Sequence, residues 1–268
     1  MSPSSSRPSR GPWPVLGVFT LLAFLFSGAL GVLQSAAGVD GEVLTLAQFG
    51  PALGALAAWL IYRKRLKALL PEAVSRRQVT AHTGLMVAAV GLFALIVVAC
   101  TLALGEDFAG VSSVAGAPFL LYLVLQLVGA TGEEIGWRGF MQPLFETKMG
   151  RLAAASATGV VWAVWHVQIF TAGFAVAASF VVATVAFAIL LGYMGNGAFW
   201  QRVLTAAIGH WLINVVLHTV AGGQVNESPQ VYVTAVAAVV TTAVFLAVFA
   251  RARVVRVRKR EQESAAAR

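Results

Sequence analysis

Long apolar stretches alternate with short polar segments along the whole chain. Each stretch is about 20 residues long, which is the length that an α-helix needs to cross the hydrocarbon of a bilayer. The pattern therefore predicts an all-α, polytopic membrane protein, a bundle of eight transmembrane helices. The predicted spans cover about residues 13–35, 44–62, 83–104, 116–145, 152–171, 174–195, 198–221 and 230–250.

The positions of the basic residues predict how this bundle is oriented. All 19 Lys and Arg residues fall in the head, the tail, or the alternate loops and helix ends that share one side with them. The opposite loops carry only acidic charges, at Asp40, Glu42, Glu106, Asp107 and Glu227. Because loops rich in Lys and Arg stay in the cytoplasm, we expect the N- and C-termini to be cytoplasmic.

A single transmembrane domain accounts for most of the chain. We expect a disordered cytoplasmic head at 1–12, a transmembrane domain at 13–250, and a basic cytoplasmic tail at 251–268 that is unstructured after Arg260. The first apolar stretch is long for a cleaved secretory signal, and seven further spans follow it. No internal repeat is visible, so the inverted-repeat architecture of many transporters has no support.

Composition agrees with this class of protein and excludes others. The 268 residues are 59% hydrophobic and 11% charged, with a mean hydropathy of +0.81. Soluble domains are about 45–50% apolar and about 25% charged. The net charge of +8 lies in short runs beside apolar stretches, where it suits membrane lipid headgroups and not nucleic acid. The single cysteine, Cys100, excludes an internal disulfide.

Two adjacent carboxylates and a guanidinium lie in the apolar stretch 116–145. Each ionised side chain near a bilayer centre costs roughly 2.5–3.5 kcal/mol, so such residues usually have a function. Glu134 and Arg138 are four residues apart and share a helix face, where they can form an ion pair. Glu133 lies about 100° around the helix axis and is left to exchange protons with water. A salt bridge that only joins helices would leave Glu133 unexplained.

Two further polar pairs lie in later apolar stretches, Trp162 with His166 and His210 with Asn214. In each pair the residues are four apart and share a helix face. At 1.5 Å per residue, these side chains and the two glutamates lie about 12 to 21 Å from the basic side. We expect them to converge in one layer that opens toward the cytoplasm, with Trp162 and Trp165 as walls of the substrate pocket. Each histidine alone is equally compatible with a core residue bonded to a backbone carbonyl.

This arrangement suits amide hydrolysis by a water molecule that a glutamate activates. A proton-coupled transporter, with Glu133, Glu134 and His166 as the relay, is the alternative from another class. A zinc site formed by Glu133, His166 and His210 is an open alternative for the cofactor. The chain lacks an H-E-x-x-H motif and Asn214 is a poor zinc ligand, which favours a mechanism without a metal.

The ordered set Glu133-Glu134-x-x-x-Arg138, aromatic-x-x-x-His and His-x-x-x-Asn resembles the motifs of the CPBP intramembrane proteases. This family includes the type II CAAX prenyl proteases and the bacterial bacteriocin-processing and immunity proteins, also called the Abi family. The resemblance covers about residues 116–220, and the family's eight-helix layout agrees with the predicted bundle. Trp162 stands where the family usually has Phe, which keeps an aromatic wall.

The resemblance implies a role for each motif residue. Glu133 would be the general base that activates water, held in place by the ion pair on the same helix. His166 would position the water, and His210 with Asn214 would form an oxyanion hole. The family is often labelled metalloprotease, so the cofactor stays open.

The resemblance also implies what the protein acts on. We expect an intramembrane endopeptidase that cleaves a peptide or protein near its C-terminus or close to the membrane, whether lipidated or not. The abundant Ala, Val, Gly and Arg are typical of a GC-rich bacterial genome, so we expect a bacterial cytoplasmic membrane. A non-catalytic immunity or scaffold protein is the alternative within the family.

Overall fold

The chain folds into helices only. The computed structural model describes residues 11–67, 69, 71–111 and 114–266; this described part contains no β-strand, and the model is 80% helix. The prediction of an all-α fold is therefore confirmed. The expected disorder of the head falls largely on residues 1–10, which lie outside the described residues.

Each predicted span has a helical counterpart, and short 3-10 or π segments adjoin several of them. In chain order the elements are α1 (Trp13–Ala36), the 3-10 helix η1 (Leu46–Phe49), α2 (Gly50–Leu66), α3 (Arg76–Ala103), α4 (Phe119–Glu134), the π-helix η2 (Ile135–Met141), α5 (Gln142–Glu146), α6 (Arg151–Trp165), the 3-10 helix η3 (Val167–Thr171), α7 (Phe174–Met194), α8 (Phe199–Ala221), the 3-10 helix η4 (Gly222–Gln224) and α9 (Gln230–Ala266). Because α9 continues to Ala266, the expectation of an unstructured tail after Arg260 is wrong.

Six of the helices in the described residues are long and apolar enough to span a membrane. Two predicted spans are shorter than expected. Stretch 44–62 begins with the 3-10 turn η1, which leaves 17 residues in α2. Stretch 152–171 ends as a helix at Trp165, because His166 has φ −80° and ψ 59° and leaves the helical conformation. The helix α6 therefore has 15 residues, and His166 is its C-cap.

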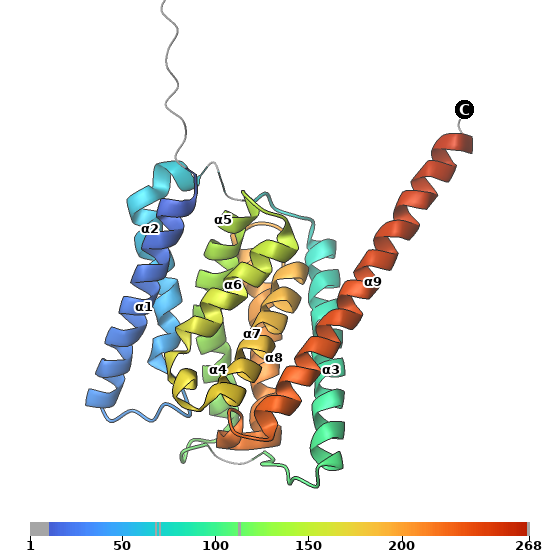
Figure 1. Cartoon of the computed structure of the whole chain (residues 1–268). Helices are drawn as coiled ribbons and strands as arrows, with labels where there is room; N and C mark the ends of the chain where they lie inside the picture. The colour runs from blue at the N-terminus through green and yellow to red at the C-terminus, as the bar shows by residue number, and fades with distance from the viewer. Residues whose placement is uncertain (1–10, 68, 70, 112–113, 267–268) are drawn as a thin grey trace, which may run out of the picture.

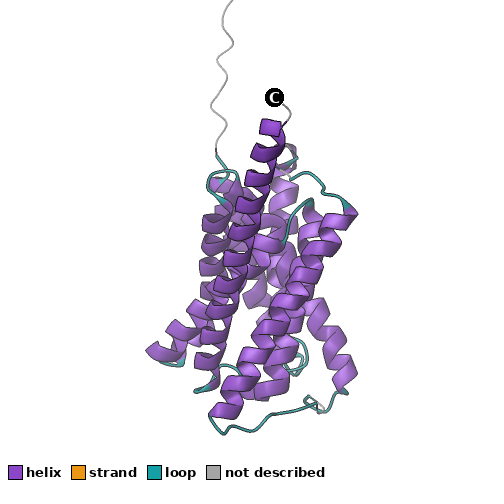
Figure 2. Cartoon of the chain, turned by 90° about the vertical axis from the view of Figure 1, so that its right-hand side faces the viewer, coloured by secondary structure: helices purple, strands orange, loops and turns teal. Residues whose placement is uncertain are grey.

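Most of the helices lie side by side in roughly one direction, and α9 runs obliquely to them (Figures 1 and 2). The α1–α2 pair forms one flank, α3 and α9 form the other, and α4, α6, α7 and α8 lie between them. The loops after α1, α3 and α8 gather at the bottom of Figure 1. We call this the acidic end, because these loops carry the five acidic residues at positions 40, 42, 106, 107 and 227. The opposite, basic end carries the Lys and Arg residues between α2 and α3, after α5 and at the start of α8.

Small residues on α4 and η2 allow η1 and α2 to pack closely against them. A Cβ atom at Gly132 would lie 3.0 Å from the Gln48 carbonyl oxygen, and one at Gly136 would lie 2.8 Å from the Pro51 carbonyl carbon and oxygen. Real Cβ atoms rarely come so close, so larger residues would push the two segments apart. This close packing brings Gln48 beside Glu133.

Candidate functional site

The two glutamates end α4, directly before a change in helix type. Residues Ile135–Met141 form a π-helix, in which hydrogen bonds run from residue i to i+5. Such segments are rare and often occur at functional sites. All of η2 except Ile135 is buried. The sequence predicted one uninterrupted helix over 116–145, so this π segment is a finding of the structure.

Glu134 is the centre of a fully buried ion cluster. Its Oε1 atom accepts hydrogen bonds from Arg138 Nη1 at 2.7 Å and from His210 Nδ1 at 2.9 Å. The Arg138 guanidinium also lies 4.3 Å from the centre of the Trp162 ring, a cation–π contact. The predicted Glu134–Arg138 pair is present. His210 joins it across the bundle and ties α8 to α4.

Glu133 has a different set of partners. Gln48 Nε2 donates to its Oε1 at 3.0 Å, and Trp162 Nε1 donates to its Oε2 at 2.7 Å. Both donors are neutral, and the side chain is only 3% exposed. The hydrogen bonds of Glu133 therefore go to partners outside the Glu134–Arg138 pair, as the helix periodicity predicted, and each of its oxygens accepts one hydrogen bond from a neutral donor.

Glu133 and His166 both line a cavity of about 300 Å³. It lies between α1, η1, the end of α4 and η3, and its lining residues are Phe24, Ser27, Gly28, Thr45, Ala47, Gln48, Glu133, Trp165, His166, Val167 and Gln168. Trp165 is held at this wall by a 2.8 Å hydrogen bond from its Nε1 to Ser27 Oγ. The predicted place of Trp165 in a pocket wall agrees with this lining.

His166 reaches the cavity from a position that the sequence did not predict. It stands after the end of α6, and its Nδ1 lies 2.9 Å from the Trp162 carbonyl oxygen. Because a carbonyl can only accept, Nδ1 carries the proton, and Nε2 of the neutral ring is left as an acceptor. The helix ends at this pair, and the Trp162 and His166 ring centroids are 6.0 Å apart, so the expected proximity of the two side chains is kept.

Two further cavities adjoin the first. One of about 100 Å³ is lined by Trp162, His166, His210 and Asn214 among others. Another of about 390 Å³ is lined by residues that include Asn214, Gln48 and Thr45. Trp162 thus takes its predicted place in a pocket wall. The six predicted site residues converge in one region, although Asn214 bonds to Gln126 at 3.4 Å and not to either glutamate.

The direction in which these cavities open differs from the expectation. The third cavity reaches the loops that hold Glu42, Gly223 and Asn226, at the acidic end. No Lys or Arg is among the residues that line the three cavities. The expected opening toward the basic side is therefore wrong for the cavities in the described part of the chain.

Glu133, His166 and His210, the ligands of the alternative zinc site, do not form a metal-binding cluster in the described residues. In the part of the chain that the structure describes, no group of three or more His, Cys, Asp or Glu side chains is placed to hold one ion. Both Glu133 oxygens accept hydrogen bonds, and His210 Nδ1 bonds to Glu134.

Comparison with models of known protein families gave a match. Residues 115–216 match a family model described as Type II CAAX prenyl endopeptidase Rce1-like. The family resemblance is confirmed. The Rce1-like segment runs from the loop before α4 into α8 and contains all six predicted site residues. Comparison with curated proteins gave no match.

The Rce1-like segment and the apolar helices together indicate the class of protein. Its family is one of CAAX prenyl endopeptidases, which supports proteolysis as the type of activity. Six apolar helices and this family indicate an integral, multi-pass membrane protein.

Gln48 and Gln126 are the site residues that sequence reasoning missed. Gln48 lies in η1, outside the Rce1-like segment, and Gln126 lies on α4 about two turns before Glu133. Both are uncharged polar residues in predicted apolar spans, and that was the signal available in the sequence. It is weak, because single Gln residues also occur in spans without a role in a site.

Proposed function

We propose that the protein is a membrane-embedded CAAX-type endopeptidase in which Glu133 activates a water molecule for peptide hydrolysis. The observation that carries the proposal is the position of Glu133. It is a buried carboxylate, held by two neutral donors, at the wall of a cavity of about 300 Å³ that also contains His166. An unpaired carboxylate beside a cavity inside a membrane has little structural purpose and suits a general base.

The chemistry follows from these positions. Glu133 removes a proton from water, and the resulting hydroxide attacks the carbonyl carbon of the scissile peptide bond. The Nε2 atom of His166, as an acceptor, orients the water. Asn214 donates to the oxyanion of the tetrahedral intermediate through its amide, and His210 donates through Nε2 in the imidazolium form, in which Nδ1–H stays bonded to Glu134; one such donor contributes about 10²- to 10³-fold. When the C–N bond breaks, the proton passes from Glu133 to the leaving amine.

The buried ion cluster has a positioning role in this scheme. Glu134, Arg138 and His210 connect α4, η2 and α8 through hydrogen bonds of 2.7 and 2.9 Å. These contacts keep Glu133 and the donors on α8 at a constant separation while a substrate binds. Breaking one buried partner of such a cluster typically costs 3–5 kcal/mol, so it also stabilises the fold.

The arrangement in the membrane is part of the proposal. All eight helical segments enter the bilayer, and both termini are cytoplasmic, with the transmembrane domain at 13–250 and a basic tail at 251–268. The segregation of basic and acidic loops to opposite ends of the bundle supports this orientation. The shorter helices α2 and α6 pack against α1 and α7, which span the full thickness. The host membrane is the bacterial cytoplasmic membrane.

The test compares membrane proteomes of cells that carry the native protein with those that carry Glu133→Gln. This change keeps the shape of the side chain and removes the base. We expect uncleaved precursors to accumulate in the variant, which would also identify the peptide or protein substrate. Glu106→Gln, the same change in an exposed loop, is the matched control and should leave the proteome as in the wild type.

Identical proteomes for wild type and Glu133→Gln under several growth conditions would contradict proteolysis. A non-catalytic immunity or scaffold protein would then be the better interpretation. A proton-coupled transporter predicts instead that Glu133→Gln abolishes solute flux and leaves every precursor processed.

A further inference from the structure

We infer that the candidate active site is reached from the acidic end of the bundle, and that its substrate is an extended peptide segment on the extracytoplasmic side. This inference rests on the proposed function and names the substrate class of the same site. It differs from the cytoplasm-facing opening that the sequence suggested. Three observations support it: the adjoining cavities, the closed packing at the basic end, and the polar side chains that line the cavities.

The three cavities adjoin one another from Glu133 to the acidic end. The first and second share His166, and the first and third share Thr45 and Gln48. The second and third share Asn214 and Asn226. Their volumes are about 300, 100 and 390 Å³, and we infer that together they form the channel through which a substrate reaches Glu133.

The mouth of this channel is formed by loops of the acidic end. Gly41 and Glu42 come from the loop after α1, and Gly223 and Asn226 follow α8. All four residues are exposed. A peptide at this end can therefore reach the cavity wall at Glu133 without passing through the packed core.

The opposite end of the bundle is closed above the glutamates. Trp137, Arg138, Met141 and Gln142 fill the space between Glu133 and the basic end, and each is at most 1% exposed. Gln142 Nε2 also donates to the Gly192 carbonyl oxygen at 3.1 Å, which ties the start of α5 to α7.

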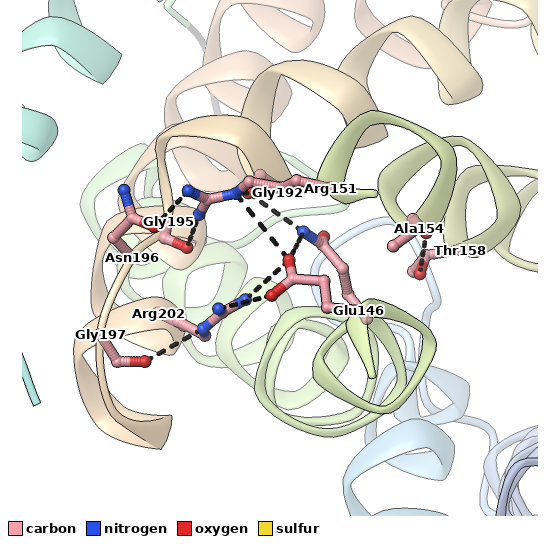
Figure 3. Close-up of polar contacts among 10 residues, drawn as sticks. Glu146, Arg151, Ala154, Thr158, Gly192, Gly195, Asn196, Gly197 and Arg202 are labelled. Carbon is pink, nitrogen blue, oxygen red and sulfur yellow. Dashed lines mark hydrogen bonds and ion pairs between the residues drawn. The ribbon is translucent and has the colours of Figure 1, made fainter. Parts of the chain in front are cut away.

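A network of charged groups covers this packing at the basic end (Figure 3). Arg202 of α8 donates to Glu146 of α5 at 2.7 Å, and its Nε donates to the Gly197 carbonyl oxygen at 3.0 Å. Arg151 of α6 donates to the carbonyl oxygens of Gly192 and Gly195 at 3.2 and 2.6 Å. These bonds join α5, α6, α8 and the end of α7, so the route from the basic side is blocked by connected elements.

The lining of the channel favours a peptide over an isoprenoid chain. Its outer part presents the polar side chains of Thr45, Tyr122, Gln126, Asn214, His218 and Asn226. An extended backbone exposes N–H and C=O groups that need such partners when they leave water, whereas a prenyl group needs an apolar wall. Among the described residues that line this outer cavity, Glu42 is the only Asp, Glu, Lys or Arg, so neutral or basic segments are preferred over acidic ones.

The orientation of the bundle decides on which side of the membrane the channel opens. If the basic end faces the cytoplasm, as the distribution of Lys and Arg indicates, the acidic end faces the extracytoplasmic space. The substrates are then peptide segments that have crossed the membrane or protrude from its outer face.

The test is the accessibility of a cysteine in the cavity that holds Glu133. Ala47→Cys lines this cavity and changes the side-chain volume little, and it is made in a Cys100→Ala background that has no other thiol. Glu72→Cys, in the exposed loop at the basic end, is the matched control. Intact cells are treated with a small, membrane-impermeant methanethiosulfonate, and the reaction is repeated on opened membranes.

We expect the cysteine at position 47 to react in intact cells and the one at position 72 to react only after the membranes are opened. A cationic reagent should react at position 47 faster than an anionic one by about tenfold, and Glu42→Gln should reduce this ratio. Reaction at position 47 only in opened membranes, or none at all, would overturn the inference.

The labelling separates this inference from the proposed function. The same pattern is expected in a Glu133→Gln background, because access does not require catalysis. If labelling follows the expected pattern but Glu133→Gln leaves every precursor processed, the channel stands and proteolysis fails. If precursors accumulate but are cleaved at cytoplasmic or prenylated C-termini, the proposed function stands and the acidic-end route is wrong.

Discussion

Glu133 and Glu134 are neighbours in the chain but have different environments in the fold. Glu134 is bonded to a guanidinium and an imidazole, whereas Glu133 is bonded to one amide and one indole N–H. A carboxylate that is paired with a cation has its charge compensated and is a poor base. The carboxylate that only neutral donors hold keeps the freedom to take a proton, and this difference assigns the two residues different tasks.

At this scale we predict an effect of Gln48→Leu on turnover. The change removes the N–H that donates to Glu133 Oε1 and leaves a side chain of similar size. A hydrogen bond to a charged group contributes about 1.5–3 kcal/mol, so kcat should fall by about 10- to 100-fold with little change in KM. The measurement is cleavage of the substrate found in the proteome comparison.

The control for this prediction is Gln224→Leu, the same substitution at an exposed position. The unfolding temperature in detergent should be similar for both variants. If Gln48→Leu unfolds at a much lower temperature and its remaining folded fraction turns over normally, Gln48 has only a structural role.

At the scale of elements, the site depends on where helices stop being regular. The chain turns from α to π directly after Glu134, α6 ends at Trp165 so that His166 can enter the cavity, and η1 delivers Gln48 before α2 begins. Each irregular segment contains or directly adjoins a polar side chain of the site. Backbone irregularity inside a membrane is tolerated where protein or a water-filled cavity surrounds it.

The close contact between η2 and α2 leads to a prediction for Gly136→Ala. The added Cβ would meet the Pro51 backbone at 2.8 Å, so α2 has to move away. Overpacking of this kind costs about 1–3 kcal/mol, and the movement should also draw Gln48 from Glu133 and lower turnover.

Gly91→Ala in α3 is the matched control, because nothing lies within 4 Å of a Cβ at that position. It should be neutral or stabilising by up to about 1 kcal/mol, since Ala favours helix over Gly. Thermal unfolding in detergent measures both variants, and equal stability of the two would contradict the packing argument.

At the scale of the whole molecule, charge and packing divide the bundle into two different ends. One end is closed by a hydrogen-bonded network around Glu146 and Arg202, and the other is open through a polar channel. Because of this asymmetry, substrates can enter from one end only, and the packed end shields the buried ion cluster from solvent. It also allows orientation and access to be tested separately.

Reporter fusions test the proposed orientation of the chain in the membrane. A fluorescent protein that matures only in the cytoplasm should fluoresce when it follows Arg268. Alkaline phosphatase, which is active only outside the cytoplasm, should be active when inserted beside Glu106 and inactive when inserted beside Glu72. Phosphatase activity beside Glu72 would reverse the proposed orientation.

The sequence by itself determined the fold class, the approximate helices and the polar residues that converge. Apolar stretches long enough to cross the bilayer are expected to form helices, because backbone N–H and C=O groups in lipid need hydrogen-bond partners within the protein. Helical periodicity was enough to pair Glu134 with Arg138 and to separate Glu133 from them, since both relations lie within one local turn.

Only the tertiary structure decided the partners of Glu133, the position of His166 outside a helix and the direction in which the site opens. Gln48 is far from Glu133 along the chain, and its contact depends on how closely η1 packs against glycines of α4. The end of α6 and the π segment are small changes in backbone conformation that hydropathy does not record. Access depends on which loops leave space between helices and which close it, and this is a property of side-chain packing among distant segments.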